Sequence, residues 1–142
     1  MTYRILCVCL GNICRSPTAE AALRAAMPHA TIDSAGTAGW HVGAPPYGPM
    51  QTAARAGGLD LAPLRARQVT AGDFDRFDLI LAMDDSNMDD LRALDPGGPA
   101  RLAKYLDPLG GGDVPDPYYT RDFNGVLALI QHAAQAWARD LA

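Results

Sequence analysis

Three consecutive segments near the N-terminus decide the fold: RILCVC (residues 4–9), LGNICRS (10–16) and PTAEAALRAAM (17–27). The first is an almost wholly apolar run with β-formers, which is typical of a parallel strand buried on both faces. The second is rich in turn-forming residues, and the third in strong helix formers. We expect Ser16 to be the N-cap and Pro17 the first helical residue, where a missing N–H is harmless. The chain therefore opens as strand, loop and helix.

Apolar runs and helix-forming segments alternate along the rest of the chain. Strands are expected at 30–34, 78–83 and 100–106, and helices at 49–56, 70–77 (with Thr70 as cap), 84–94 and 122–141. This alternation predicts a three-layer α/β domain, in which helices flank a mostly parallel sheet. No repeat, linker or low-complexity tract divides residues 1–142, so a single domain is expected. Ligands bind such sheets at the carboxyl ends of the strands, and the first strand ends at Cys9.

The composition excludes several classes of protein. With 49% hydrophobic and 20% charged residues the chain is globular, and its net charge of −4 argues against nonspecific nucleic-acid binding. No apolar run reaches the roughly 18 residues that span a bilayer, and the short apolar stretch after residues 1–4, with no small-residue cleavage site, leads us to expect no secretory signal. We therefore expect no membrane association and a cytoplasmic location, with later export left open. Cys7, Cys9 and Cys14 indicate thiol chemistry, because an odd, clustered set is no secreted disulfide framework and no second ligand cluster suggests a metal.

Cys9 and Arg15 bracket a loop that joins the end of a strand to the start of a helix. Successive N–H groups in such a loop can point inward and form a nest for an anion, and the helix end adds positive potential. Gly11 and Asn12 are the residues there that best tolerate left-handed backbone conformations. The loop therefore predicts a phosphate site.

The side chains around this loop predict nucleophilic attack on phosphorus. A Cys9 thiolate is the attacking form, and Arg15 offers a planar fork that can bind two phosphoryl oxygens. Ser16 can donate its hydroxyl to the thiolate. The alternative is a buried strand cysteine beside a surface arginine, but the preceding strand and the following Ser-Pro helix start favour the chemical interpretation.

The segment VCLGNICRSP (8–17) resembles the signature of the low-molecular-weight protein tyrosine phosphatases. Further motifs similar to those of the family follow in order: DSAGT (33–37), Trp40, ARQ (66–68), MDDSN (83–87) and DPYY (116–119). The resemblance implies a flavodoxin-like sheet of four parallel strands, a phosphocysteine intermediate, and neither metal nor other cofactor. It also implies that Asn12 and Ser34 form hydrogen bonds that fix the shape of the loop. The residues expected to bind phosphate or substrate are Leu10, Gly11, Asn12, Ile13, Cys14, Ser16, Trp40, Tyr118 and Tyr119.

Cleavage of a phosphotyrosine needs an acid that protonates the leaving oxygen and then activates water. By chemistry alone Asp84, Asp113 and Asp116 are all candidates. Asp116 is favoured because it lies in a long loop, 107–121, and Pro117 stiffens the backbone after it. The resemblance selects Asp116, since the DPYY motif carries that family's general acid.

Trp40, Tyr118 and Tyr119 can wall a slot deep enough for an aryl phosphoester and too deep for phosphoserine, although a packing role for Trp40 stays open. By resemblance, Trp40 and Tyr118 line the cleft, and Tyr118 and Tyr119 are phosphorylated in some members. The expected partners are phosphotyrosine proteins and a cognate tyrosine kinase. The chain is expected to be monomeric or weakly self-associating.

Some positions leave two interpretations or depart from the family. Cys14 either packs beneath the loop or forms a reversible disulfide with Cys9, which the resemblance favours. Leu64 stands where many members carry a His that supports the phosphate loop, so this support is altered. Tyr47-Gly48-Pro49 replaces an Asp-Pro-Arg sequence common in the family, which changes the rim of the pocket.

Three other functions are compatible with a cysteine loop of this kind. A thioredoxin-coupled arsenate reductase needs further cysteines downstream, and none follows Cys14. A phosphoarginine phosphatase would use the same loop and acid and stays open, although Trp40 and Tyr118 favour an aryl substrate. A noncatalytic phosphotyrosine-binding or redox-sensing module has no need of Asp116.

Overall fold

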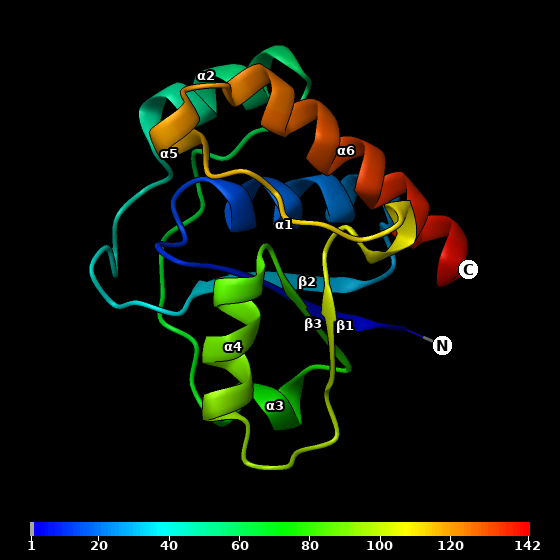
Figure 1. The fold of residues 1–142 in the computed structure, drawn as a ribbon. Coiled ribbons are helices and arrows are strands. Elements are labelled where there is room, and N and C mark those ends of the chain that lie inside the picture. Colours follow the sequence, from blue (N-terminus) through cyan, green and yellow to red (C-terminus); the bar gives the residue numbers. More distant parts are fainter. Residues whose placement is uncertain (1) are drawn as a thin grey trace.

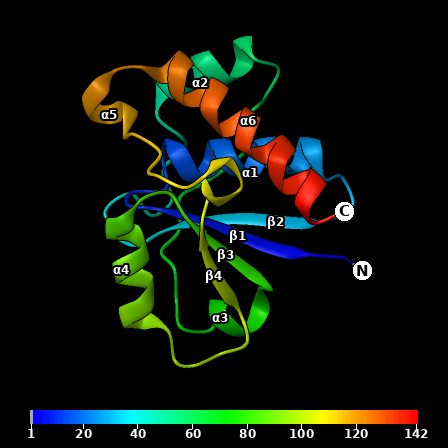
Figure 2. The ribbon, with the colours of Figure 1, turned by 45° about the vertical axis from the view of Figure 1, so that its right-hand side comes forward.

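Strands and helices alternate along the computed structural model, which describes residues 2–142. The elements are β1 (Arg4–Cys9), α1 (Arg15–Ala26), β2 (Thr31–Gly36), α2 (Gly48–Ala56), α3 (Asp73–Arg76), β3 (Leu79–Ala82), α4 (Asp85–Leu94), β4 (Arg101–Lys104), the 3-10 helix η1 (Asp107–Leu109), α5 (Pro117–Thr120) and α6 (Phe123–Asp140). The sheet lies between a layer of α1, α2, α5 and α6 and a layer of α3 and α4 (Figures 1 and 2). The predicted three-layer α/β architecture is confirmed.

The four-stranded sheet has the order β2-β1-β3-β4, and each neighbouring pair of strands is parallel. This is the flavodoxin-like order that the family resemblance implies. The chain passes from β1 to β2 on one side and then to β3 on the other side of β1. The strand order therefore reverses at β1, and a ligand crevice is expected beyond its carboxyl end, where Cys9 lies.

Strand β1 contributes alternate side chains to two cores, because successive residues of a strand point to opposite faces. Ile5, Cys7 and Cys9 belong to the core below α1 and α6. Leu6 and Val8 belong to the core against α3 and α4. Complete burial of an Ile or Leu side chain contributes roughly 1.5–3 kcal/mol. The Cys9 side chain therefore lies on the same face of the sheet as α1, because it shares the core of Ile5 and Cys7.

Helix α6 packs over α1 and is tied to the segment that leaves β4. The Trp137 indole donates a hydrogen bond to the Tyr105 carbonyl (2.8 Å), and the Tyr105 hydroxyl donates one to the Ile130 carbonyl (2.7 Å). All three side chains are buried, so these bonds satisfy polar atoms that water cannot reach. They fix the start of the segment that later carries Asp116.

The start of α1 differs from the prediction. The helix begins at Arg15 with Cys14 as its N-cap, so the assignment of Ser16 as the cap was wrong. The Ser16 hydroxyl instead lies 3.0 Å from Cys9 Sγ and accepts a hydrogen bond from Asn12 Nδ2 (2.7 Å). Because no side chain caps α1, its first N–H groups remain available to another acceptor.

Two other local predictions were also wrong. Thr70 does not cap α3, whose N-cap is Gly72; the Thr70 N–H and hydroxyl instead donate to the Asp73 carboxylate. Residues 107–121 are not all loop, because η1 and α5 lie within them. Both short helices have a proline in their first turn, where the missing N–H does no harm.

Asp73 joins α3 to the segment behind the phosphate loop. Its carboxylate is fully buried and accepts hydrogen bonds from both Arg67 Nη atoms (3.1 Å each) and from the Thr70 N–H (2.8 Å). Burial opposes the ionised form, but the Arg67 and Thr70 donors outweigh it and lower the pKa of Asp73. The Arg67 N–H in turn donates to Asn12 Oδ1 (3.0 Å).

Asp73→Ala is expected to destabilise the fold by about 3 kcal/mol at pH 7, because it removes a buried carboxylate that accepts charge-assisted hydrogen bonds from Arg67 and a hydrogen bond from the Thr70 N–H. Since the folded pKa is lowered, the ionised carboxylate stabilises the fold above its ordinary pKa of 3.8, and this contribution is lost as the pH falls through the lowered value. Urea unfolding at several pH values measures both effects. The control is Asp75→Ala, an exposed residue of the same helix. Equal losses in the two variants would contradict this role of Asp73.

Candidate active site

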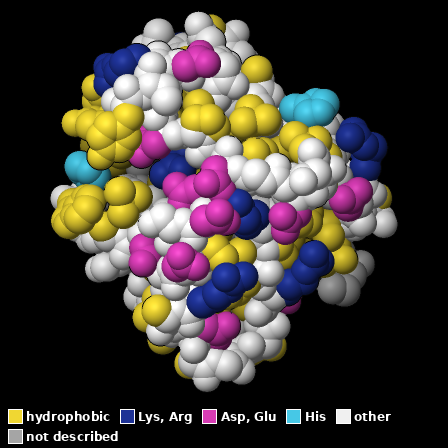
Figure 3. All heavy atoms as spheres, in the orientation of Figure 1, with side chains coloured by type: hydrophobic (Ala, Val, Ile, Leu, Met, Phe, Trp, Pro, Cys, Tyr) yellow, Lys and Arg dark blue, Asp and Glu magenta, His cyan; other side chains and the backbone are white. Residues whose placement is uncertain are grey.

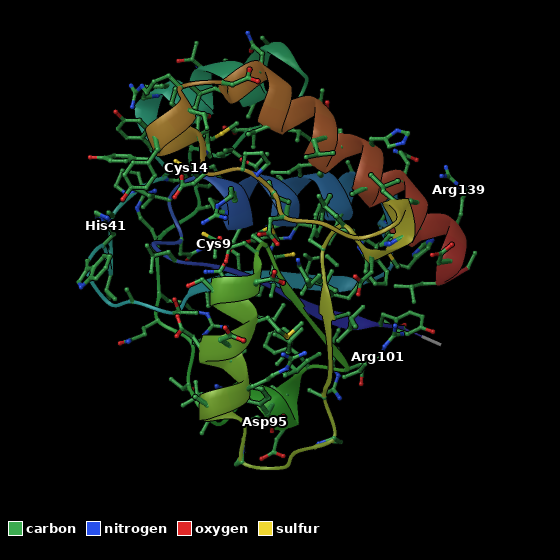
Figure 4. The ribbon with its side chains drawn as sticks, in the orientation of Figure 1. Cys9, Cys14, His41, Asp95, Arg101 and Arg139 are labelled. Atoms are coloured by element: carbon green, nitrogen blue, oxygen red, sulfur yellow. The ribbon has the colours of Figure 1, made fainter. Side chains whose placement is uncertain are left out.

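The loop of residues 10–14 curves around the thiol of Cys9. The Asn12 N–H donates to Cys9 Sγ (3.3 Å), and the Ser16 hydroxyl lies 3.0 Å from the same sulfur. Figure 4 shows Cys9, Cys14 and His41 gathered at one end of the molecule, far from Asp95, Arg101 and Arg139. The nucleophile predicted from the sequence therefore lies inside a polar cradle at the end of β1.

One of the two expected left-handed residues takes that conformation. Asn12 has φ 57°, whereas Gly11 does not have a positive φ. Gly11 serves another purpose, because a Cβ at that position would lie 3.0 Å from the His41 ring. A larger residue at position 11 would therefore have to displace the exposed His41 ring.

The N–H groups of this loop are the expected anion nest. Apart from the Asn12 N–H, which donates to the thiol, none of the amides of residues 11–15 donates to a backbone acceptor within residues 2–142. Helix α1 begins directly after the loop, so its positive end faces the same space. A phosphoryl group bound above Cys9 would supply the missing acceptors.

The Asn12 side chain orients the two hydroxyl groups behind the loop. Its Nδ2 donates to Ser16 Oγ (2.7 Å) and to Ser34 Oγ (2.9 Å). Ser34 donates its own proton to Glu20 Oε1 (2.6 Å). Because Ser16 Oγ already accepts from Asn12, its proton can be donated to Cys9 Sγ (3.0 Å) or to the Ala35 carbonyl (3.4 Å). The predicted supports Asn12 and Ser34 are thus placed directly behind the nucleophile.

The support network ends on a carboxylate rather than on a histidine. Leu64, at the family's His position, packs against the core. The almost fully buried Glu20 instead pairs with Arg24 (2.6 Å), four residues later on α1. Burial raises the pKa of Glu20, although Ser34 and Arg24 act in the opposite direction. Sequence reasoning missed Glu20, whose signal was an acidic residue on the otherwise apolar side of α1.

Arg15 is held from three sides by residues distant in sequence. Its Nη1 donates to Asp84 Oδ2 (2.7 Å) and to the Val114 carbonyl (3.0 Å), and its Nη2 lies 3.5 Å from Asp116 Oδ2. Burial disfavours its charge, but Cys9 and Asp84 outweigh this and raise the pKa of Arg15. The guanidinium is thus charged and fixed in orientation beside the thiol.

The structure distinguishes the three candidate acids. Asp84 pairs with Arg15 and also accepts the Asn87 N–H (2.8 Å) as the N-cap of α4. Asp113 is paired with Lys104 outside the cleft. Only Asp116 of the three lines the cleft above Cys9. Its Oδ1 accepts the Tyr118 N–H (3.0 Å), which leaves Oδ2 toward Arg15.

A single cleft brings most of the predicted residues together. It is lined by Cys9, Leu10, Gly11, Ile13, Cys14, Arg15, Trp40, His41, Asp116, Tyr118 and Tyr119. Asn12, Ser16 and Ser34 lie behind it as supports. His41 was not predicted, and its only signal was its position next to Trp40.

The aromatic residues form the rim of this cleft. Trp40 and Tyr119 are 74% and 75% exposed, which argues against a packing role for Trp40. Tyr47 supports the rim: its ring centroid lies 5.4 Å from that of Tyr118, and its hydroxyl accepts from Arg121 Nη1 (3.1 Å). Tyr47, which departs from the family pattern, therefore adds a third tyrosine beside Tyr118 and Tyr119 at the rim of the cleft.

Cys14 is a buried free thiol that lines the same cleft as Cys9. Burial, and then the negative charge of Cys9, raise the pKa of Cys14 to about 12. Cys14 is therefore a protonated thiol in the reduced protein. Cys7 is buried in the core, as expected.

Comparison with protein families accords with this geometry. The family model described as "Low molecular weight phosphotyrosine protein phosphatase" matches residues 4–142. The chain belongs to this family. It is accordingly a protein-tyrosine phosphatase, and the recognition made from the Cys9 loop is confirmed.

Individual relatives of this phosphatase cover most of its length. It is 42% identical to the low molecular weight protein-tyrosine-phosphatase YfkJ of Bacillus subtilis, over 89% of this chain and 88% of that protein. It is 44% identical to a low molecular weight protein-tyrosine-phosphatase of Streptomyces coelicolor, over 94% and 90%. Among solved structures, Vibrio vulnificus Wzb in complex with benzylphosphonate has a TM-score of 0.92 and 33% identity, covering 99% of both chains.

None of the helices that this phosphatase forms within residues 2–142 is long and apolar enough to cross a bilayer.

Proposed function

We propose that this phosphatase hydrolyses phosphotyrosine in proteins through a phosphocysteine on Cys9, with Arg15 binding the phosphoryl group and Asp116 as general acid and base. The observation that carries the proposal is that a thiol and a guanidinium at the two ends of one loop, and a carboxylate from a distant segment, line one cleft. Each has the chemistry that one step of the reaction needs.

In the first step, the Cys9 thiolate attacks phosphorus and the bond from phosphorus to the tyrosyl oxygen breaks. Asp116 gives its proton to that oxygen, so tyrosine leaves as a neutral phenol. The N–H groups of residues 11–15 and the Arg15 guanidinium stabilise the charge on the phosphoryl oxygens.

In the second step, water hydrolyses the phosphocysteine. The Asp116 carboxylate takes a proton from the water while its oxygen attacks phosphorus, and the bond between sulfur and phosphorus breaks. The Ser16 hydroxyl, 3.0 Å from Cys9 Sγ, stabilises the departing thiolate. Phosphate leaves, and Asp116 is protonated again for the next cycle.

The rim supports an aromatic substrate. Trp40, Tyr118 and Tyr119 offer exposed ring surfaces around the phosphate site, against which a phenyl ring can stack. The benzylphosphonate named for Vibrio vulnificus Wzb is itself an aromatic phosphonate. We therefore propose phosphotyrosine proteins, and the tyrosine kinases that produce them, as the partners of a single domain acting inside the cell.

Asp116→Asn tests the acid. We expect it to lower kcat/KM for phenyl phosphate about 10²- to 10³-fold, because phenolate is a poor leaving group without a proton. The loss for p-nitrophenyl phosphate is expected to be much smaller, since nitrophenolate leaves unassisted. The assay contains a chelator, and phosphotyrosine and phosphoarginine peptides are run in parallel. Asp113→Asn is no suitable control because it alters the same loop, so Asp122→Asn serves instead. Equal losses for both aryl esters would contradict the role of Asp116, and faster turnover of phosphoarginine would overturn the proposed substrate.

A further inference from the structure

The segment that carries Asp116 is preceded by three glycines around which there is open space on the side-chain side. Gly110, Gly111 and Gly112 all have positive φ (99°, 94° and 99°), and a Cβ at any of them would meet no atom within 4 Å. The glycines follow η1 directly, and the Gly111 N–H donates a hydrogen bond to the Leu106 carbonyl (3.0 Å). The position of the following acid segment, residues 113–116, therefore depends on contacts made after the glycines.

Lys104 makes the first of those contacts. It is the last residue of β4, and its side chain is 17% exposed. Its Nζ pairs with the Asp113 carboxylate and with Oδ1 of Asp85 (2.8 Å). Asp85 is the first residue of α4. The Asp113 carboxylate also accepts the Asp85 N–H (3.2 Å). Lys104 thus joins a strand, a helix start and the acid segment at one point.

Asp113, which Lys104 holds, directly precedes Val114, whose carbonyl contacts Arg15. Val114 is buried, its N–H donates to the Met83 carbonyl (2.8 Å), and its carbonyl accepts from Arg15 (3.0 Å). Two residues later, Asp116 Oδ2 lies 3.5 Å from the same guanidinium. A displacement of Asp113 would therefore be transmitted over a few bonds to both contacts with Arg15.

Charge makes Lys104 necessary at this position. The Asp85 and Asp113 carboxylates both contact Lys104 Nζ. Without this cation between them, their like charges would repel. Figure 3 shows acidic side chains gathered at the middle of this face, over the N-terminal end of α4, with basic groups among them. Surface pairs usually contribute little, but one cation between two carboxylates in a network is the exception.

We propose that Lys104 is a positioning residue for the general acid: it holds the acid segment so that Asp116 reaches the leaving oxygen. This inference rests on the role of Asp116 in the proposed function. It predicts a specific loss of leaving-group protonation rather than a general loss of activity.

The test compares kcat/KM for phenyl phosphate and for p-nitrophenyl phosphate, because their ratio reports protonation and cancels effects on phosphate binding. Lys104→Gln is expected to lower this ratio about 10-fold, since small misplacements of a catalytic group carry large rate penalties. Lys104→Arg is expected to keep the ratio within about 2-fold of wild type, because it retains the cation. The control Arg92→Gln removes an equal charge from the exposed side of α4, where Arg92 pairs loosely with Asp89 (3.9 Å), and should leave the ratio unchanged.

A double-mutant cycle identifies the partner. In the Asp116→Asn background, Lys104→Gln is expected to change the ratio no further, because its effect acts through Asp116. Asp113→Asn provides a second route to the same loss if Lys104→Gln folds poorly. An equal loss for both substrates in Lys104→Gln and Asp113→Asn, with the ratio unchanged, would overturn the inference. Failure of the proposed function would look different, because Asp116→Asn itself would then leave the ratio at the wild-type value.

Discussion

Cys9→Ser is expected to reduce phosphatase turnover by at least about 10⁴-fold, the largest loss predicted for any substitution in this chain. A thiol near the Asn12 N–H and the Ser16 hydroxyl can attack as the thiolate, whereas a serine hydroxyl in the same place stays protonated. The side chain is otherwise nearly the same size, so the fold should be retained.

The measurement for Cys9 combines steady-state assays with a trapping experiment. Wild-type enzyme is mixed with p-nitrophenyl phosphate, quenched in acid within the first turnovers, digested and analysed by mass spectrometry. We expect a phosphoryl group on the peptide that contains Cys9, and none in Cys9→Ser. Cys7→Ala is the matched control, because Cys7 lies on the same face of β1 but outside the cleft. A phosphoryl group on another residue, or full activity of Cys9→Ser, would refute the proposed nucleophile.

Arg15→Lys is expected to lower kcat/KM about 10³-fold although the positive charge is retained. The guanidinium contacts Asp84, the Val114 carbonyl and Asp116 with separate N–H groups, and its planar fork can still face the phosphate. A single ammonium cannot serve both sets of partners. Asp84 and Val114 would then lose their donor, which adds a loss of stability.

The measurements for Arg15→Lys are kcat/KM for both aryl esters and the inhibition constant of inorganic phosphate, with thermal unfolding as a check on the fold. Both esters should lose activity to a similar degree, in contrast to Asp116→Asn. Arg92→Lys, on the exposed side of α4, is the control. A kcat/KM of Arg15→Lys within about 10-fold of wild type would show that a positive charge at position 15 is enough for catalysis and that the planar guanidinium is not needed.

The parts of the site that are local in sequence could be predicted, and those built from distant segments could not. Residues 4–27 specify strand, loop and helix by composition alone, so the position of Cys9 at the end of a strand followed directly. The partners of Arg15 did not, because Asp84 and Val114 lie 69 and 99 residues away and only the sheet order brings them near. Lys104 was missed for the same reason, because its partner Asp85 lies 19 residues away.

Where local rules gave a wrong answer, the side chain expected to cap a helix had another hydrogen-bond partner. Ser16 has the residue type and position of an N-cap, but its hydroxyl is engaged by Cys9 and Asn12. Thr70 likewise gives its hydrogen bonds to Asp73 instead of capping α3. Gly11 was expected to adopt a left-handed conformation, but its φ is not positive, and its nearest neighbour is the His41 ring. Two of these exceptions, Ser16 and Gly11, lie in or beside the proposed phosphate loop, where function can override local propensity.

The long sequence separation between Arg15 and the Val114 carbonyl also bears on how the enzyme is made. A ribosome releases Cys9 and its loop first, and Val114 follows 99 residues after Arg15, shortly before Asp116. Until then β1 lacks the cover of α6, and Arg15 lacks two of its partners. A nascent or prematurely terminated chain would therefore carry the reactive cysteine without the groups that complete the reaction. Fragments that end before Val114 are therefore expected to be inert as phosphatases, so activity reports only chains that extend beyond Asp116.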